Sequence, residues 1–282
     1  MAAPKGKDDL TFIEHLEELR WHIARSLLAV TIIAIVVFML PGVLFDTIIF
    51  GPKSEGFLTY TFFCKLSAWL GLGETLCIKP SAFDVINLEM SGQFLAHIKI
   101  SFIAGLVVAF PYIFWEIWRF VRPGLYQSEI NAMRGVVGAG SLLFLLGILF
   151  GYYIITPFSI NFLVSYTVST EVGNNIAFAS YVDTILAIVL ASGIMFELPL
   201  VVFFLSKMGL LTPEDMRAYR RHALVVILIV AAVITPPDVF SQILVTFPVY
   251  LLYELSINIS ARVAKKRAVE ESEIDQRIEK VH

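Results

Sequence analysis

The sequence predicts an all-α membrane protein with six transmembrane helices, and three observations support that prediction. Hydrophobic residues make up 57% of the 282 residues, charged residues make up 16%, and the mean hydropathy is +0.78. Soluble domains hold about 45–50% apolar and about 25% charged residues, so this composition excludes an aqueous fold. The apolar residues form runs as long as a bilayer requires, about 20 residues each, and the cations gather in alternate loops.

The first element is an amphipathic helix that we expect on the membrane surface, turning into the first span near Arg20. Thr11 and Glu14 have the spacing of a capping box, in which the two side chains bond free amides of the first turn. Apolar residues then recur at helical spacing, and acidic residues occupy the other side. Glu14 and Glu18 lie one turn apart. Spacing alone leaves two interpretations open for them, a solvated acidic face and a binding site.

Four apolar runs are each long enough to cross the bilayer, at residues 21–40, 94–118, 132–155 and 181–208. Two shorter runs, at 223–234 and 239–257, are separated by Thr235-Pro-Pro-Asp238, and neither helix can continue through two prolines. They predict a hairpin of two short spans at the C-terminal end. Gln242, Thr246 and Glu254 of that hairpin can also simply satisfy one another inside the bundle. We expect one membrane domain over residues 1–258 and a charged cytoplasmic tail over residues 259–282.

The distribution of cations places both ends of the chain in the cytoplasm. With the N-terminus inside, 17 of the 21 Lys and Arg lie in cytoplasmic segments, as the positive-inside rule requires. A long first external loop then covers residues 41–91 and includes the apolar stretch Phe57–Leu70. Its 14 residues measure about 21 Å as a helix, and a seventh span would place Arg262–Arg267 outside. We therefore expect an interfacial helix there rather than a seventh crossing.

The only two cysteines, Cys64 and Cys77, fall in this external loop. They are too few for a disulfide scaffold or a zinc site. In an oxidising compartment, a bond across 13 residues would stabilise the loop by about 3 kcal/mol in the chain-entropy account. We expect a disulfide, and two free apolar cysteines are the alternative.

Two further carboxylates lie where the sequence gives them unusual surroundings. Glu129 follows the chain break at Pro123-Gly124 and the capping residue Ser128, so a helix dipole alone can account for it. Glu197 lies ten residues before Lys207, about 15 Å from the cytoplasmic interface. An acid at that depth is protonated, bonded to a backbone group freed by a nearby proline, or functional. Function is the interpretation we favour.

Catalytic and nucleic-acid-binding classes are excluded by what the sequence lacks. It has no HExxH, no Gly-x-Ser-x-Gly and no P-loop, and its five histidines are scattered. The formal net charge of −3 does not suit a strongly basic nucleic-acid binder. We expect no enzyme activity, no cofactor and no metal.

Five stretches together resemble the TatC subunit of the twin-arginine protein translocase, and they occur in order over nearly the whole chain. They are His15-Leu-Glu-Glu-Leu-Arg20, Phe120-Val-Arg-Pro-Gly-Leu-Tyr126 followed by Glu129, Phe196-Glu-Leu-Pro199, Leu211-Thr-Pro-Glu-Asp215 and Thr235-Pro-Pro-Asp-Val-Phe-Ser-Gln242. The six-span topology with both ends inside agrees with this resemblance. The first external loop is longer than that of the family and carries both cysteines, so the counterpart of Pro52 is not assigned.

The resemblance implies a cofactor-free receptor in a bacterial inner membrane that binds the Arg-Arg signal peptides of folded precursors. It also implies a homo-oligomer in the receptor complex, TatA/TatB-type single-span partners and transport driven by the proton motive force. The residues implied for signal-peptide binding are Glu18, Glu129, Arg20, Phe120, Leu125 and Tyr126. Glu197 matches a carboxylate linked to partner contacts, and Asp238 and Gln242 match the external end of the last hairpin.

A proton-coupled small-molecule transporter, with Glu197 as its proton carrier, is the alternative from another class. It accounts for the acid inside the membrane. It does not account for two acidic patches at the cytoplasmic surface, nor for the lack of the internal repeats that many such transporters have.

Overall fold

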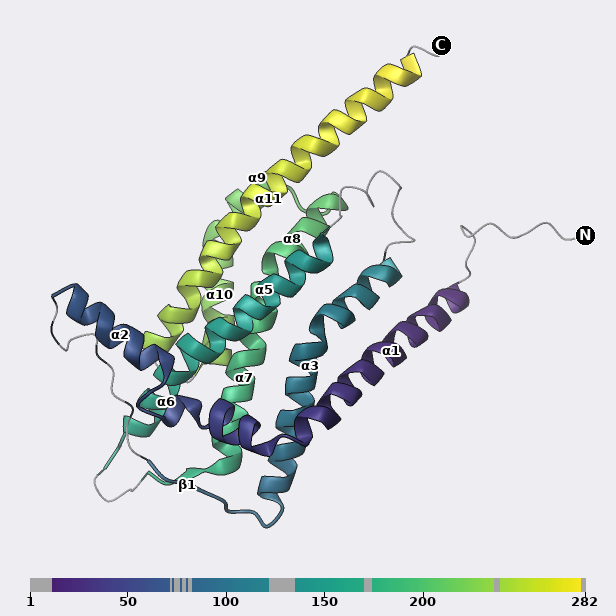
Figure 1. Cartoon of the computed structure of the whole chain (residues 1–282). Helices are drawn as coiled ribbons and strands as arrows, with labels where there is room; N and C mark the ends of the chain where they lie inside the picture. The colour runs from purple at the N-terminus through teal and green to yellow at the C-terminus, as the bar shows by residue number, and fades with distance from the viewer. Residues whose placement is uncertain are drawn as a thin grey trace, which may run out of the picture. The chain divides into compact units, whose positions relative to one another are not determined.

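The computed structural model describes residues 12–71, 73, 77, 80, 83–121, 135–169, 174–235 and 239–279, and most of them are helical (Figure 1). The chain divides into two compact units. The first unit contains Met1–Thr47 and Gln93–Leu142, and the second contains Ile48–Gly92 and Leu143–His282. The predicted all-α membrane fold is confirmed at this level.

Two long helices, α1 (Phe12–Phe38) and α3 (Gly92–Val121), run side by side in the first unit (Figure 1). We expected a surface helix that turns near Arg20, and this is wrong, because α1 continues through that residue without a break. It contains neither proline nor glycine to interrupt it. The two helices approach closely at Gly105, where an added Cβ would lie 2.8 Å from the carbonyl oxygen of Val30.

The second unit is built from many shorter elements. In chain order these are η2 (Gly51–Lys53), α2 (Leu58–Trp69), β1 (Val85–Ile86), η4 (Gly151–Ile155), α6 (Thr156–Ser165), β2 (Ile176–Ala177), α7 (Phe178–Phe196), α8 (Leu198–Lys207), α9 (Pro213–Ala218), α10 (Arg220–Ile234) and α11 (Val239–Glu279). Two helices, η1 (Val43–Ile49) and α5 (Val136–Phe150), cross the boundary between the units. β1 and β2 pair in parallel, with Val85 opposite Ile176.

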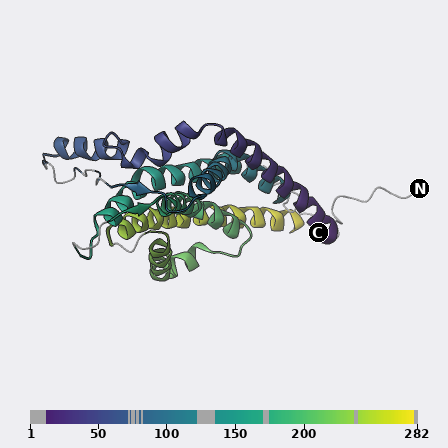
Figure 2. The same cartoon turned by 90° about the horizontal axis from the view of Figure 1, so that it is seen from below.

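The core of the second unit lies between η4, α7, α10 and α11. Ile155, Ile188, Ile227 and Val245 are buried there against one another. Small residues allow α5 and α7 to meet closely, because a Cβ on Gly147 would lie 2.6 Å from the Ser192 carbonyl oxygen. α11 continues as a single helix of 41 residues to Glu279, so its final turns extend through the charged tail (Figure 2).

Among the described residues, five helical segments are long and apolar enough to cross a membrane. They are Glu17–Phe38, Gly92–Val121, Val136–Ser165, Phe178–Lys207 and Ser241–Lys266. The remaining predicted span, 223–234, falls within α10, whose 15 residues measure about 22 Å. This is shorter than the roughly 30 Å bilayer core, so a sixth crossing remains a prediction of the sequence.

Three tyrosine hydroxyls hold the backbone that follows α1. Those of Tyr152 and Tyr181 donate to the carbonyl oxygens of Ile48 and Ile49, at 2.7 and 2.9 Å. Tyr60 of α2 donates to the carbonyl oxygen of Pro52 at 2.9 Å. Burial raises the pKa of Tyr60 to about 12, so this hydroxyl remains a hydrogen-bond donor even above the ordinary tyrosine pKa of about 10. These bonds fix the start of the loop that precedes the cysteines.

Cys64 of α2 forms a disulfide with Cys77, with the two Cα atoms 4.2 Å apart. This is the bonded alternative of the two that the sequence left open. We expect Cys77→Ala to lower the free energy of unfolding of the loop by about 3 kcal/mol. Without the disulfide, the unfolded chain regains the conformational freedom that the closed loop removes. Alkylation of denatured protein before and after reduction gives the direct check by mass. Two alkylated thiols in the non-reduced sample would contradict the bond.

Candidate functional site

A buried carboxylate, Glu116, is the centre of a polar cluster in the first unit. Its side chain is 1% exposed although it lies in the apolar helix α3. A hydrogen bond joins its Oε2 to Nδ1 of the buried His22, and the Arg25 Nε lies 3.8 Å from the same oxygen. The Tyr112 hydroxyl donates to Oε1 at 3.0 Å, and Arg119 Nη1 lies 4.0 Å from it. We call these five residues the Glu116 cluster.

Helical spacing explains why these five side chains meet. Tyr112, Glu116 and Arg119 are four and three residues apart, so they share one face of α3. His22 and Arg25 are three apart and share one face of α1. The cluster therefore forms where two polar stripes on neighbouring helices face each other.

Glu116 was not among the residues that the sequence singled out. The rule that selected Glu197, an ionisable group inside an apolar run, applies equally to Glu116 in the predicted span 94–118. It lies close to the end of that span, among four aromatic residues from Tyr112 to Trp118, and such aromatic residues are typical of the membrane interface. Its partner His22 is 94 positions away, and no local pattern connects the two.

The predicted receptor residues that the structure describes lie close to this cluster in the chain. Glu18 is exposed on α1, one turn before His22. Arg20 forms an exposed ion pair with Glu17 at 3.4 Å. The Phe120 ring packs edge-on against the His22 ring, with the centroids 5.9 Å apart. Leu125, Tyr126 and Glu129 lie outside the described residues, so the structure does not place Glu129 relative to Glu18.

An apolar groove of about 560 Å³ runs between α1 and α3 next to the Glu116 cluster. Leu19, His22 and Phe120 line it near the N-terminal end of α1, and Val30 and Phe102 line it further along. Nearly all of its wall is aliphatic or aromatic. It suits an extended or helical apolar segment.

Glu197 lies at the junction of α7 and α8, inside the segment Phe178–Lys207. Pro199 in the first turn of α8 accounts for the break between the two helices. Both carboxylate oxygens are buried and no side chain of the described residues bonds to them; the backbone of Phe144 in α5 faces the carboxylate, but without the geometry of a normal hydrogen bond. The local bond to a freed backbone carbonyl, one of the sequence-based interpretations, is therefore not formed.

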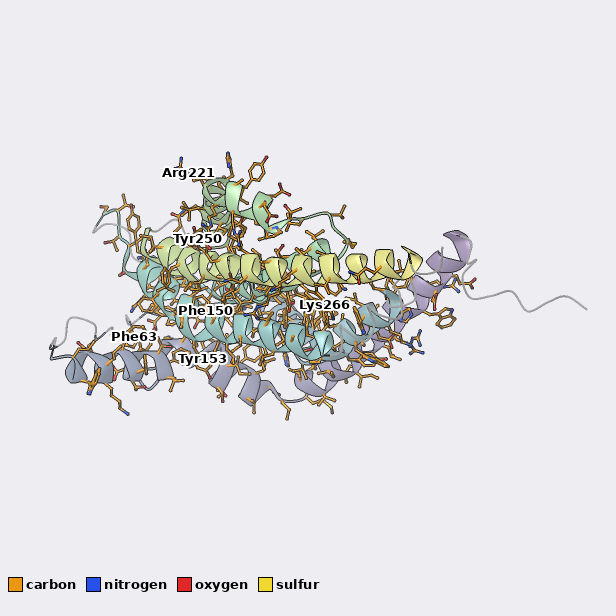
Figure 3. All side chains as sticks on the ribbon, turned by 90° about the horizontal axis from the view of Figure 1, so that it is seen from above. Phe63, Phe150, Tyr153, Arg221, Tyr250 and Lys266 are labelled. Atoms are coloured by element: carbon orange, nitrogen blue, oxygen red, sulfur yellow. A yellow bond between two sulfur atoms is a disulfide. The ribbon has the colours of Figure 1, made fainter. Side chains whose placement is uncertain are left out.

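The three polar side chains of the α10–α11 hairpin do not bond to one another as one alternative supposed, although the Thr246 hydroxyl donates to the Gln242 carbonyl oxygen at 2.7 Å. Gln242 donates instead to the Leu228 carbonyl oxygen of α10 at 3.2 Å. Glu254 accepts from Arg220 of α10 at 2.8 Å and from Tyr250, seen on α11 in Figure 3, at 3.1 Å. These bonds tie α11 to α10 at two levels. Asp238 lies outside the described residues.

The fold and these sites define a helical membrane protein with several apolar spans and carboxylates buried within two of them. A family model described as Sec-independent protein translocase protein (TatC) matches residues 14–248. This chain therefore belongs to the TatC family, whose members are components of a Sec-independent protein translocase.

Individual relatives agree with the family model. A TatC protein of Blattabacterium is 37% identical over 262 residues, which cover 93% of this chain and 98% of the relative. A TatC protein of Helicobacter pylori is 45% identical over 179 residues, or 64% of this chain and 72% of the relative. A crystal structure described as the twin arginine translocase receptor TatC in DDM has a TM-score of 0.68 at 30% identity. That likeness covers 88% of this chain and 99% of the crystallised one. These relatives are named as translocase proteins, which are not enzymes.

Proposed function

We propose that this chain is the signal-peptide receptor of a twin-arginine translocase in a bacterial inner membrane. In this role it binds the Arg-Arg signal peptides of folded precursors at the cytoplasmic face, where both termini lie. It acts as a homo-oligomer within the receptor complex and supports export driven by the proton motive force. Support comes from the similar crystal structure, which is described as that of a twin arginine translocase receptor.

The observation that carries the proposal is the pairing of an exposed acid with an apolar groove in one unit. Glu18 is exposed one turn before His22, and His22 is one of the residues that line the groove. Signal peptides present the matching order, a cationic segment followed by an apolar one of about 7–15 residues. Glu18 then receives an arginine while the apolar residues occupy the groove.

Two arginines call for a second carboxylate, and we assign that role to Glu129. A guanidinium keeps its charge at any physiological pH and binds a carboxylate through two parallel hydrogen bonds. Lysine lacks that planar pair of donors, so it substitutes poorly. Arg20, Phe120, Leu125 and Tyr126 belong to the surroundings of this site in the proposal.

We assign partner recruitment to Glu197 in the second unit. Its two oxygens have no hydrogen bond among the described residues, and lipid cannot supply one. A polar group on the transmembrane helix of a TatA/TatB-type partner can. Asp238 and Gln242 then belong to the external end of the α10–α11 hairpin of the same unit.

Equilibrium binding of a labelled signal peptide to the protein in lipid nanodiscs tests the proposal. We expect the Arg-Arg peptide to bind at least tenfold more tightly than the same peptide with Lys-Lys, because the bidentate contacts are lost. The Lys-Lys peptide has the same charge and apolar segment, so it controls for nonspecific binding to lipid. Equal affinities for the two peptides would refute a receptor for paired arginines.

A further inference from the structure

The proposed function gives no role to Glu116, although this residue forms more polar contacts than any proposed receptor residue that the structure describes. Four side chains surround its carboxylate, two from α1 and two from α3. Only His22 and Arg25 connect it to α1, so the cluster links two helices that are distant in sequence.

The link matters because α1 has few other buried contacts. Among the α1 side chains that the structure describes, residues 17–38, only His22 and Val30 are buried. Val30 lies at the close approach to Gly105, and the two buried residues are eight positions apart, or about 12 Å along the helix. Among the α1 side chains described before Val30, His22 is therefore the single buried anchor.

Within a membrane, a polar anchor of this kind sets how two helices sit against each other. Lipid tails are as apolar as leucine side chains, so hydrophobic contact alone gives little preference for one rotation or axial position of a helix over another. A hydrogen bond between His22 and Glu116 is satisfied in one arrangement only. The exposed rings of Trp21 and Trp115 beside the cluster are typical of the interfacial level of a bilayer.

Glu18 lies on the N-terminal side of His22 on the same helix, α1. It precedes His22 by one turn, so the two share a face of α1. Because α1 and α3 are joined through Glu116, the turn of α3 that follows Glu116 reaches the same level. That turn carries Phe120, whose ring contacts His22, and the chain continues from it toward Glu129.

We propose that Glu116 is a positioning residue for signal-peptide recognition, which locks α1 to α3 so that Glu18 is held at a fixed place beside the end of α3. This inference rests on the proposed function. Glu116 itself does not touch the peptide, since its side chain is 1% exposed. Its charge faces Arg25 of α1 and Arg119 of α3, and His22 and the Tyr112 hydroxyl complete its polar contacts.

Glu116→Gln is the test substitution because it keeps the size of the side chain and removes the charge that draws α1 and α3 together. We expect the affinity for the Arg-Arg peptide to fall by about tenfold, the loss of one charge-assisted contact. In a Glu18→Ala background the same change should lower the peptide affinity by less than twofold, because the contact between α1 and α3 acts on the peptide through Glu18. Equal losses in both backgrounds would overturn the proposal, as would unchanged affinity.

Glu254→Gln is the matched control, since Glu254 also accepts from one arginine and one tyrosine, but in the second unit. It should leave peptide affinity within twofold of the parent. A restoring variant, His22→Glu with Glu116→His, exchanges acid and base between the helices and should restore the arrangement of α1 and α3. Because His22 also lines the proposed peptide groove, this variant is read by the distance between the two helices and not by affinity. Failure to restore that distance, with the protein still folded and monodisperse, would mean that Glu116 does not act through His22.

Spin labels attached at Glu17→Cys on α1 and Val121→Cys on α3 measure the distance between the two helices without any peptide. They therefore test directly whether Glu116 fixes α1 against α3. The native cysteines are bonded to each other and do not react. We expect one narrow distance distribution in the parent, a broader one with Glu116→Gln, and a narrow one again in the exchanged pair.

If the parent does not distinguish Arg-Arg from Lys-Lys peptides, the proposed function fails, and the role of Glu116 in recognition fails with it. If the Glu18→Ala effect is present but Glu116→Gln changes neither affinity nor distance, the lock alone fails.

Discussion

Replacing Glu18 or Glu129 by alanine is expected to weaken binding of an Arg-Arg signal peptide by about ten- to a hundredfold. Charge-assisted hydrogen bonds are worth about 1.5 to 3 kcal/mol each when part of the water is excluded, and each 1.4 kcal/mol is tenfold in affinity. The loss should shrink when the matching arginine of the peptide is already lysine. Peptides in which one arginine or the other is replaced by lysine are titrated against both variants in nanodiscs. The difference in affinity loss between these peptides and the Arg-Arg peptide measures the coupling between each carboxylate and its arginine.

Glu17→Ala supplies the control for that experiment. Glu17 adjoins Glu18, but its side chain is 64% exposed and already pairs with Arg20. Exposed pairs of this kind are worth about 0–1 kcal/mol, so peptide affinity should change little. If Glu18→Ala and Glu129→Ala both bound the Arg-Arg peptide as tightly as the parent, neither residue would belong to the receptor site. Glu18 would then be part of a solvated acidic helix face, and Glu129 would only interact with a helix dipole in its first turn.

Replacing Glu197 by alanine should abolish most association with single-span partners while leaving peptide binding near the parent value. The reason is that its two buried oxygens, to which no side chain of the described residues bonds, are the groups that a partner's polar side chain would satisfy. Glu197→Gln should be milder, because an amide still donates and accepts. Co-purification of partner subunits at fixed detergent and salt measures the effect. Normal co-purification with Glu197→Ala would remove Glu197 from the interface.

The helical fold was predictable from the sequence because lipid imposes a simple rule on it. Runs of about 20 apolar residues must form helices to satisfy their backbone groups, and the structure has helices in each of the six predicted regions that it describes. The break at Glu197 also has a local cause, in Pro199. The expected turn near Arg20 failed for the converse reason, since the amphipathic pattern changes there without any residue that interrupts a helix.

The contacts between distant segments were not predictable in the same way. The bond from His22 to Glu116 and the three tyrosine bonds to the carbonyl oxygens of Ile48, Ile49 and Pro52 depend on how helices pack. Neither set leaves a periodic pattern in the sequence. Glu18 and Glu197 were singled out from the sequence because Glu18 repeats the charge of Glu14 one turn away and Glu197 lies inside an apolar span. Glu116 also lies inside an apolar span and was not singled out.

The most direct test of receptor function is photo-cross-linking of an Arg-Arg signal peptide to the protein in membranes, with the photoreactive group beside the arginine pair. The account predicts adducts on residues 17–22 of α1 and on the segment that contains Glu129, with a strong decrease for the Lys-Lys peptide. Adducts confined to the second unit, around Glu197 or the α10–α11 hairpin, or adducts equally strong for both peptides, would contradict it.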